Sequence, residues 1–319
     1  MNIFITGEKG FIAQNLPSSL AKYGSSVISL SNMKMKGKEV CVHSNAEDQW
    51  VDALAKNKVD LIIHNAAVVG TDVVALDPHE STLSNVTGTH IICRAAKKIE
   101  IPVCYIGTTV IYNTPLYQDT YITEMSDKKP RTLYGIQKLA SENIVTSYCQ
   151  KWLIMRPLFA YGGVGDMNSL VAKTFYSFLK NKKDQIDMFL DPLKYKDYMH
   201  VEDFCDAVSI ACHGQSWNED YNVAAETPCP TGKIIEMMSE VANFDLEKCL
   251  KWYPRTDYLG NHRLASKKFR REFKWQPSFS IREGIEEAWY SIKAGKSDYN
   301  PLKYLEEAQQ KNIDLTEFY

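Results

Sequence analysis

The sequence predicts an α/β fold: a doubly wound parallel sheet with helices on both faces, joined to a smaller C-terminal α/β domain. Short apolar runs alternate with longer helix-like segments up to about residue 160, which is typical of βαβ units. A turn with two glycines joins the first apolar run to the first helical segment. Beyond this part, the alternation loosens into loops, helices and isolated strands. We therefore expect domains at 1–160 and 161–319, with some segments of the second returning to the sheet of the first.

The apolar runs define the strands of the expected sheet, and the segments between them define its helices. The expected strands are 2–6, 26–30, 40–42, 59–64, 102–107 and 152–157. The expected helices are 10–23, 48–57, 77–98 and 131–150. Short apolar runs suit strands that are buried on both faces, whereas the intervening segments are long enough for several helical turns.

Composition and charge limit the classes of function. The chain has 319 residues, 45% hydrophobic and 24% charged, as expected of a soluble globular protein. The formal net charge of -2 gives no overall basic field, so we expect neither nucleic acid nor a membrane as partner. No run reaches the ~18 apolar residues of a membrane span, and the start "MNIFITG" has no charged leader, so we expect a cytoplasmic protein. The cysteines form no CxxC pair and the histidines no HExxH motif, so we expect no metal site.

The glycine turn "TGEKGFIAQNL" follows the first strand and opens the first helix. Backbone N–H groups in such a turn, together with the helix N-terminus, approach a pyrophosphate closely. The spacing is G-x-x-G followed by Ala13 rather than the full G-x-G-x-x-G, so a plain strand-to-helix turn stays open as an alternative. The cofactor-binding reading makes the sheet Rossmann-type. Its candidate contacts in this turn are Gly7, Lys9, Gly10, Phe11 and Ile12.

The end of the second strand indicates which nicotinamide cofactor is bound. NAD-binding folds usually place an acid there, about 20 residues after the glycines, to hold the ribose hydroxyls. This chain has no acid between Glu8 and Glu39. Ser31, Asn32 and Lys34 are instead suited to a 2′-phosphate, which favours NADP(H) over the alternative NAD. A solvated basic loop is the other interpretation of this segment.

A phenol and an amine share one helical face in "TLYGIQKLA". Tyr134 and Lys138 are four residues apart, so on a helix they lie about 6 Å apart along the axis. An ammonium about 4 Å from a phenol stabilises the phenolate enough to lower its pKa by two or three units. Tyr134 is therefore a candidate acid or base. A solvated surface pair is the alternative for such a motif taken alone.

Several further segments occur in a recognisable order along the chain. They are "HNAA", "NVTGT", "IGTTVIY", "YGIQK", "MRPLFAYGG", "DYMHVED" and "ASKKFRREFKWQP". Together with the glycine turn, they resemble the extended short-chain dehydrogenase/reductase family, in its branch of nucleotide-sugar epimerases, dehydratases and reductases. The resemblance implies that Tyr134 exchanges a proton with a sugar oxygen while hydride passes between its carbon and the nicotinamide. It also implies that Lys138 holds the nicotinamide ribose and that Thr108 hydrogen-bonds the reacting oxygen.

The same resemblance implies further contacts and a quaternary state. The additional cofactor contacts would be Asn65, Ala66, Ala67 and Asn85. The substrate contacts would be Thr109, Asn168 and Arg255, the last two on the diphosphate of a nucleotide sugar. Asn168 and Arg255 are equally compatible with solvated loops. The stretches 80–98 and 132–150 resemble those that pair relatives into homodimers.

Missing acids narrow the expected reaction. In the family's 4,6-dehydratases an Asp-Glu pair follows the threonine, whereas here Thr109 and Val110 follow Thr108. The segment "AAVVGTDVV" resembles GDP-fucose synthase, but the positions of its epimerising cysteine and histidine hold Val110 and Leu170. We therefore expect NADPH-dependent reduction of C4 in a nucleoside-diphosphate 4-keto-6-deoxy sugar. A redox-neutral, NAD-dependent 4-epimerase and a non-catalytic NADP(H)-sensing or scaffolding protein remain alternatives, and the tail 300–319 receives no function.

Overall fold

The computed structural model describes most of the chain. The described ranges are 1–28, 46–113, 120–166, 169–180, 186–188, 190–214, 216–246, 250–253 and 261–294. The following positions considered above lie outside them: the expected strand at 40–42, the tail 300–319, Ser31, Asn32, Lys34, Asn168 and Arg255.

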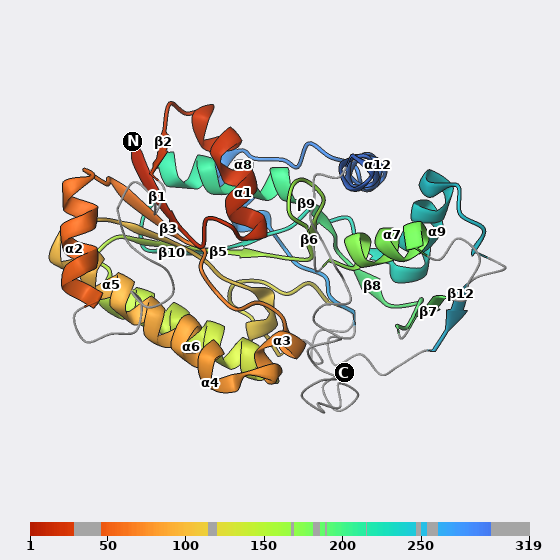
Figure 1. Cartoon of the computed structure of the whole chain (residues 1–319), viewed down its shortest axis with the longest axis horizontal. Helices are drawn as coiled ribbons and strands as arrows, with labels where there is room; N and C mark the ends of the chain where they lie inside the picture. Colours follow the sequence, from red (N-terminus) through yellow and green to blue (C-terminus); the bar gives the residue numbers. More distant parts are fainter. Residues whose placement is uncertain are drawn as a thin grey trace.

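Within these ranges, a six-stranded parallel sheet forms the centre of the molecule (Figure 1). Its strands, in spatial order, are β10 (Glu219–Val223), β5 (Trp152–Pro157), β4 (Val103–Ile106), β3 (Leu61–His64), β1 (Asn2–Thr6) and β2 (Ser26–Ile28). All of the pairings between neighbouring strands are parallel. The predicted α/β class with a parallel sheet is confirmed.

The order in which strands are added to the sheet reverses at β1. From β1 the chain passes to β2 on one side, and it later returns to β3 on the other side. All four residues of β3 and most of β1 are buried, as expected where helices cover both faces. In such sheets, ligands bind outside the carboxyl ends of the strands at the point of reversal. The fold therefore directs attention to the segments that follow β1 and β3.

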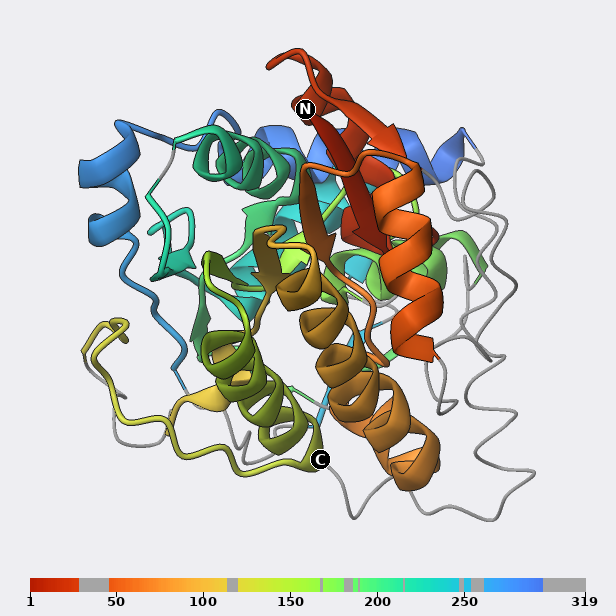
Figure 2. The same ribbon diagram turned by 90° about the vertical axis from the view of Figure 1, so that its left-hand side faces the viewer.

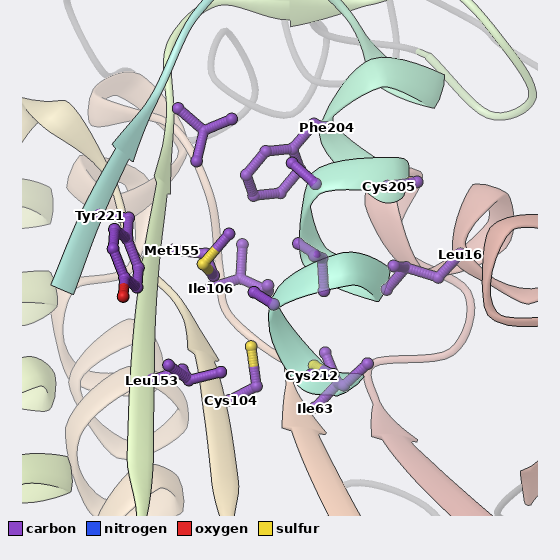
Figure 3. Close-up of a cluster of buried hydrophobic side chains, with 14 of the residues drawn as sticks. Leu16, Ile63, Cys104, Ile106, Leu153, Met155, Phe204, Cys205, Cys212 and Tyr221 are labelled. Atoms are coloured by element: carbon purple, nitrogen blue, oxygen red, sulfur yellow. The ribbon is translucent and has the colours of Figure 1, made fainter. Parts of the chain in front are cut away.

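Helices cover the two faces of the sheet in separate layers. On one face, α5 (Gly88–Lys98) packs between α2 (Ala46–Lys56) and α6 (Leu133–Tyr148), as Figure 2 shows. On the other face, α1 (Phe11–Ala21) packs against α8 (Val201–His213). Leu16, Ile63 and Phe204 belong to the apolar core beneath α1 and α8 (Figure 3). Full burial of each such side chain contributes about 1.5–3 kcal/mol.

The expected helix 77–98 is built from three pieces. They are α4 (Pro78–Thr82), a π-helical turn η2 (Leu83–Thr87) and α5. Asp77 caps α4 by accepting a hydrogen bond from the N–H of Glu80 at 3.0 Å. The expected single helix is thus continuous along the chain, but its hydrogen-bonding pattern changes at η2. A further short helix, α3 (Thr71–Leu76), was not predicted.

The second half of the sequence contributes to two regions. One end of the molecule, at the right in Figure 1, contains α7 (Leu170–Lys180), α9 (Thr231–Ala242), β7 (Ile186–Met188) and β12 (Leu250–Trp252). Nearby lie the short strands β6 (Ala160–Tyr161), β8 (Tyr195–Lys196), β9 (Met199–His200) and β11 (Cys229–Pro230). The second half also contains α11 (Lys267–Phe273) and α12 (Ile281–Lys293). By contrast, β10 belongs to the central sheet and α8 lies on it. In the first half, the short 3₁₀-helix η3 (Thr109–Ile111) follows β4. Among the described residues, no helix combines the length and apolar character that a bilayer crossing requires.

Candidate functional site

The glycine turn lies at the carboxyl end of β1, where the strand order of the sheet reverses. Gly7 has a φ of +68°, and a Cβ placed on it would lie 2.8 Å from Cα of Ala66. Both the backbone angle and the close approach therefore require glycine. The N–H of Gly10 donates to the carbonyl of Gly7 at 2.8 Å, which closes the turn just before α1 begins. The turn and the helix N-terminus form a cradle of backbone N–H groups suited to an anion.

A hydroxyl ties this cradle to the segment after β3. Thr6 Oγ1 accepts the backbone N–H of Asn65 at 3.1 Å and that of Ala66 at 3.0 Å. With two donors already accepted, its own proton is donated to Nδ1 of His64, 2.7 Å away. The predicted cofactor positions Gly7, Asn65 and Ala66 thus meet at one place.

The hydrogen bonds continue through a buried, neutral histidine. His64 Nε2 donates to Thr89 Oγ1 at 2.9 Å, and Thr89 donates to the carbonyl of Asn85 at 2.6 Å. Burial, together with the nearby charge of Lys138, lowers the pKa of His64 to about 3. The ring is therefore uncharged, with its proton on Nε2. We call Thr6, His64, Thr89 and the Asn85 carbonyl the neutral chain.

The Asn85 side chain fixes the backbone beside the same cradle. Its Oδ1 accepts the N–H of Val68 at 2.7 Å, and its Nδ2 donates to the carbonyl of Val68 at 3.0 Å. Nδ2 also donates to Oε1 of Gln137 on α6 at 2.8 Å. The two amide protons are thus donated within the protein, so Asn85 positions the predicted cofactor segment and links it to α6.

The candidate catalytic side chains lie around the end of β4. Thr108 and Thr109 are buried, and Thr108 caps η3 by accepting the N–H of Val110 at 3.4 Å. On α6, Lys138 Nζ donates to the carbonyl of Ile106 at 2.7 Å. A Cβ on Gly135 would lie 2.8 Å from the carbonyl oxygen of Val110. Contacts from α6 therefore bracket Thr108 on both sides.

Tyr134 and Lys138 are held on a well-defined helix. Thr132 caps α6 by accepting the N–H of Gly135 at 3.1 Å. Tyr134 is 7% exposed and Lys138 3% exposed, so this is not the solvated surface pair considered as an alternative. The Lys138 ammonium also lies 4.2 Å from the centre of the Tyr105 ring. The helix thus brings the predicted amine to the strand end that precedes Thr108, and it buries the predicted phenol one turn before that amine.

Burial changes the charge of the lysine. It lowers the pKa of Lys138 to about 7, although the carboxylate of Glu142 opposes this effect. At neutral pH the amine is therefore only partly protonated, rather than fully charged as the sequence motif suggests. Its power to stabilise a phenolate depends on its neighbours.

An ion cluster beside α6 was not predicted. Arg156 Nε and Nη2 donate to the two carboxylate oxygens of Glu142, both at 2.9 Å. Nη2 also lies 2.6 Å from Oδ2 of Asp220, and Nη1 donates to the hydroxyl of Tyr112 at 3.0 Å. The sequence signal was an arginine within the apolar run "WLIMRP", because a buried charge needs partners. We call Arg156, Glu142, Asp220 and Tyr112 the arginine cluster.

A second unpredicted contact joins α1 to the loop after β6. Asn15 Nδ2 donates to the carbonyl of Val164 at 2.8 Å, and Asn15 Oδ1 accepts its N–H at 3.0 Å. Farther along this loop, Asp166 accepts the N–H of Ser169, next to α7, at 3.1 Å. The loop that leads to the predicted substrate position at 168 is thus anchored on the helix of the cradle.

The remaining predicted positions differ in exposure. Lys9 is exposed, and its carbonyl accepts from Nε2 of Gln14 at 2.7 Å. Phe11, Ile12 and Ala67 are half-buried beside the cradle. The described residues include no group of three or more side chains arranged to hold a metal ion.

Comparison with known proteins identifies related sequences. The NAD dependent epimerase/dehydratase family matches residues 3–224. A dTDP-4-dehydrorhamnose reductase from Shigella flexneri is 27% identical over 184 residues, which span 58% of this chain and 58% of the relative. The chain thus spans less than two thirds of the length of this relative. A dTDP-D-glucose 4,6-dehydratase from Homo sapiens is 22% identical over 318 residues, covering 90% of this chain and 89% of the relative.

Solved structures share the fold. UDP-glucose 4-epimerase from Thermotoga maritima with UDP-glucose superimposes with a TM-score of 0.76 at 21% identity, over 92% of this chain and 99% of that one. RMD from Pseudomonas aeruginosa complexed with NADPH gives 0.81 at 19% identity, with the same coverage of 92% and 99%. These likenesses confirm the predicted Rossmann-type fold. Because the family match covers more than half of the chain, the protein belongs to the NAD dependent epimerase/dehydratase family, as its motifs indicated.

Proposed function

We propose that the protein reduces C4 of a nucleoside-diphosphate 4-keto-6-deoxy sugar with NADPH. The observation that supports this proposal is the arrangement around β4: Lys138 donates to Ile106, and a Cβ on Gly135 would approach Val110. The amine and the first turn of α6, which carries Tyr134, therefore lie at the strand end that precedes Thr108. This end lies on the same edge of the sheet as the cradle at Gly7, with β3 between them. The proposal thus assigns the hydride donor to a cofactor bound at the cradle and the proton donor to Tyr134 on α6.

The residues fit a nicotinamide cofactor. The cradle of Gly7 and Gly10 lies at the N-terminus of α1, where backbone donors and the helix dipole favour a pyrophosphate. The cofactor would supply the hydride. Lys138 would hold the nicotinamide ribose, and the neutral chain would keep Asn65 and Ala66 in place beside the cradle.

The proposed reaction adds one hydride and one proton to a ketone. As hydride reaches C4, the Tyr134 hydroxyl donates its proton to the carbonyl oxygen, and Thr108 donates a hydrogen bond to that same oxygen. The tyrosine then regains a proton from solvent. Lys138, when protonated, stabilises the phenolate formed in this step.

The groups near the site do not favour other chemistry on the sugar. Thr109 and Val110 follow Thr108 and cannot act as the acid and base of a dehydration. Leu170, the first residue of α7, cannot remove a proton from a carbon next to the ketone. Hydride and proton transfer at C4 is the chemistry that remains.

A 4-epimerase is the second candidate, favoured by the similarity to UDP-glucose 4-epimerase. A reductase releases oxidised cofactor in every cycle, whereas an epimerase regenerates its own. The test is to follow the reduced-nicotinamide absorbance while GDP-, dTDP-, CDP- and UDP-linked 4-keto sugars are supplied, with chromatography of the products. Loss of absorbance with one sugar supports reduction and names the substrate class. The corresponding 4-hydroxy sugars are supplied separately without added cofactor, and their interconversion rejects reduction in favour of the epimerase. No turnover with either set of sugars supports the non-catalytic alternative.

The role proposed for Tyr134 has its own test. Tyr134→Phe removes only the hydroxyl, so binding of NADPH should persist while kcat falls by roughly 100-fold or more. Fluorescence titration of the cofactor and steady-state kinetics measure the two effects. A variant with near-normal kcat would remove Tyr134 from the mechanism.

The preference for NADP(H) is proposed from the acid-free segment that contains Ser31, Asn32 and Lys34. Replacing Lys34 by alanine should weaken binding of NADPH more than that of NADH, since only NADPH carries the 2′-phosphate. Dissociation constants of both cofactors measure this. Equal affinities in the wild-type protein would overturn the preference and strengthen the epimerase candidate.

Several further proposals concern substrate and assembly. Thr109, Asn168 and Arg255 would contact the nucleotide sugar, and residues 161–319 would supply most of its binding site. A homodimer through α5 and α6 is supported by Leu133 and Ile136, apolar side chains that are 39% and 52% exposed on α6.

A further inference from the structure

The amine of Lys138 is buried away from water. It is 3% exposed, donates to the carbonyl of Ile106 at 2.7 Å and lies against the ring of Tyr105. Loss of water around an ammonium favours the neutral amine unless a nearby anion compensates. The role proposed for Lys138 in proton transfer requires the charged form.

Glu142 is placed to compensate. It follows Lys138 by one helical turn on α6, so both side chains lie on the same face. Both also reach the same strand end: Lys138 donates to Ile106, and a Cβ on the next residue, Gly107, would lie 2.8 Å from Oε1 of Glu142. The missing side chain at Gly107 therefore lets the carboxylate approach the strand end directly before Thr108.

Arg156 holds this carboxylate in place. Its two hydrogen bonds to Glu142 are both 2.9 Å long, and the two side chains are 1% and 4% exposed. The guanidinium is itself shared with Asp220 at 2.6 Å, so Glu142 does not neutralise it alone. A bidentate pair of this kind fixes the position of the carboxylate.

The neighbouring groups on β3, β4 and α6 do not replace this charge. His64 is neutral, because burial and Lys138 lower its pKa to about 3. Burial raises the pKa of Tyr105 well above its ordinary value, so this phenol is neutral too. Tyr134 is the proton donor of the proposed reaction.

The charged groups on the other helices beside α6 have different positions or partners. On α3, Oδ1 of Asp72 lies 2.9 Å from where a Cβ on Gly70 would be. On α5, Arg94 is paired with Glu47 at 2.7 Å, and Lys97 lies over the ring of a tyrosine at the C-terminal end of α6. Among the described side chains, Glu142 is therefore the anion best placed to balance the ammonium.

We propose that Glu142, held by Arg156, is a positioning residue that favours the protonated form of Lys138 and fixes its turn of α6 against the end of β4. This inference rests on the proposed function only for its consequence in catalysis. The state of Lys138 is measurable without any substrate, so the two proposals fail separately.

The test follows the Cε signal of Lys138 by NMR in the full chain labelled with ¹³C-lysine, with the signal assigned through Lys138→Arg. Glu142→Gln keeps the size of the side chain and removes its charge. In this variant we expect the titration midpoint of Lys138 to fall by about one to two pH units relative to the wild-type protein. Asp220→Asn is the matched control, because it removes the other carboxylate that contacts Arg156, and Asp220 lies on β10 rather than on α6. In this variant the titration midpoint of Lys138 should not move.

A midpoint unchanged in Glu142→Gln, or an equal shift in Asp220→Asn, would overturn the proposal. If Glu142→Gln does not fold, Glu142→Asp keeps the charge but withdraws it by one methylene, and a smaller shift in the same direction is expected. An unchanged midpoint in that variant also overturns the proposal. With an active substrate, the alkaline limb of the kcat profile of Glu142→Gln should move down by the same number of pH units as the NMR midpoint, whereas a merely structural loss would lower kcat equally at all pH values.

Discussion

Two buried polar networks lie around the candidate site, and their polar side chains find partners in different ways. The neutral chain at β1 and β3 consists of hydroxyls, one uncharged imidazole and a carbonyl, each with a defined donor or acceptor role. The arginine cluster between α6, β5 and β10 is ionic, with one guanidinium shared by two carboxylates. A neutral network depends on direction, whereas an ionic one depends on charge balance. The two should therefore respond differently to substitution and to pH.

The difference matches what each network supports. The neutral chain positions backbone beside a cradle that would receive the negative pyrophosphate, and adding a charge there would disturb that site. The arginine cluster lies next to an amine whose charge is required. In Asp220, burial opposes ionisation, but Arg156 and nearby lysines outweigh it and lower the pKa, so this carboxylate is ionised at neutral pH.

The largest effect is expected from Arg156→Met. This change leaves Glu142 buried without its cation, and such a loss typically destabilises a protein by about 3–5 kcal/mol. Urea denaturation at pH 7.5 measures it through the midpoint. Arg282→Met is the control, because Arg282 pairs with Glu240 at 2.9 Å on the surface, where the arginine is 53% exposed, and should leave the midpoint unchanged. Similar midpoints for the two variants would contradict the importance of burial.

A moderate effect, dependent on pH, is expected from His64→Gln. In the unfolded chain His64 has its ordinary pKa near 6.5, but in the folded protein burial lowers it to about 3. Between these values only the unfolded state binds the proton, so stability is complete above pH 6.5 and falls as the solution is acidified. The slope from this residue approaches about 1.4 kcal/mol per pH unit. Glutamine does not titrate, so that part of the slope should vanish in denaturation curves between pH 6.5 and 5; an unchanged slope would mean that His64 is charged or exposed.

The smallest effect is expected from Tyr112→Phe. The hydroxyl accepts from Arg156 at 3.0 Å and donates to Oδ1 of Asn222 at 2.8 Å, but the guanidinium keeps both carboxylates. Loss of this hydroxyl removes one hydrogen bond from the charged guanidinium and one to a neutral amide, and it should cost about 1.5 kcal/mol. The same urea titration measures it. A loss as large as that of Arg156→Met would show that the hydroxyl, rather than the ion pairs, holds the cluster together.

Much of the fold could be predicted because local patterns determine it. The short apolar runs at β1, β3, β4 and β5 are typical of buried strands, and they form such strands in the structure. The glycine at position 7 indicated a tight turn, and the structure has a turn there that requires glycine. The pair Tyr134 and Lys138 was visible because one helix carries both residues. The π-turn at 83–87 was not visible, because it alters hydrogen bonding without a distinctive sequence.

The less predictable part of the site depends on contacts between distant segments. Nothing in the spacing of Arg156 and Glu142 indicates that a strand residue reaches the middle of the preceding helix. The carbonyl of Val164 meets Asn15 across 149 positions of sequence. The motif also suggested a charged lysine. In the structure, burial lowers the pKa of Lys138, so its charge depends on neighbouring groups such as Glu142. Such properties follow from tertiary packing rather than from a local pattern.

The connections of Arg156 also bear on the order in which the chain folds. Its partners Glu142 and Tyr112 lie 14 and 44 positions earlier, and Asp220 belongs to the last strand of the sheet. The guanidinium loses water when β5 is buried, but its second carboxylate arrives only when β10 docks. The entropy of closing that long loop is lost before the contact with Asp220 can stabilise the chain. The ion pair with Asp220 is therefore expected to form after the main folding barrier. Asp220→Asn should accordingly speed unfolding and leave the refolding rate unchanged, with a φ-value near 0 in stopped-flow measurements; a value near 1 would place the docking of β10 in the folding nucleus.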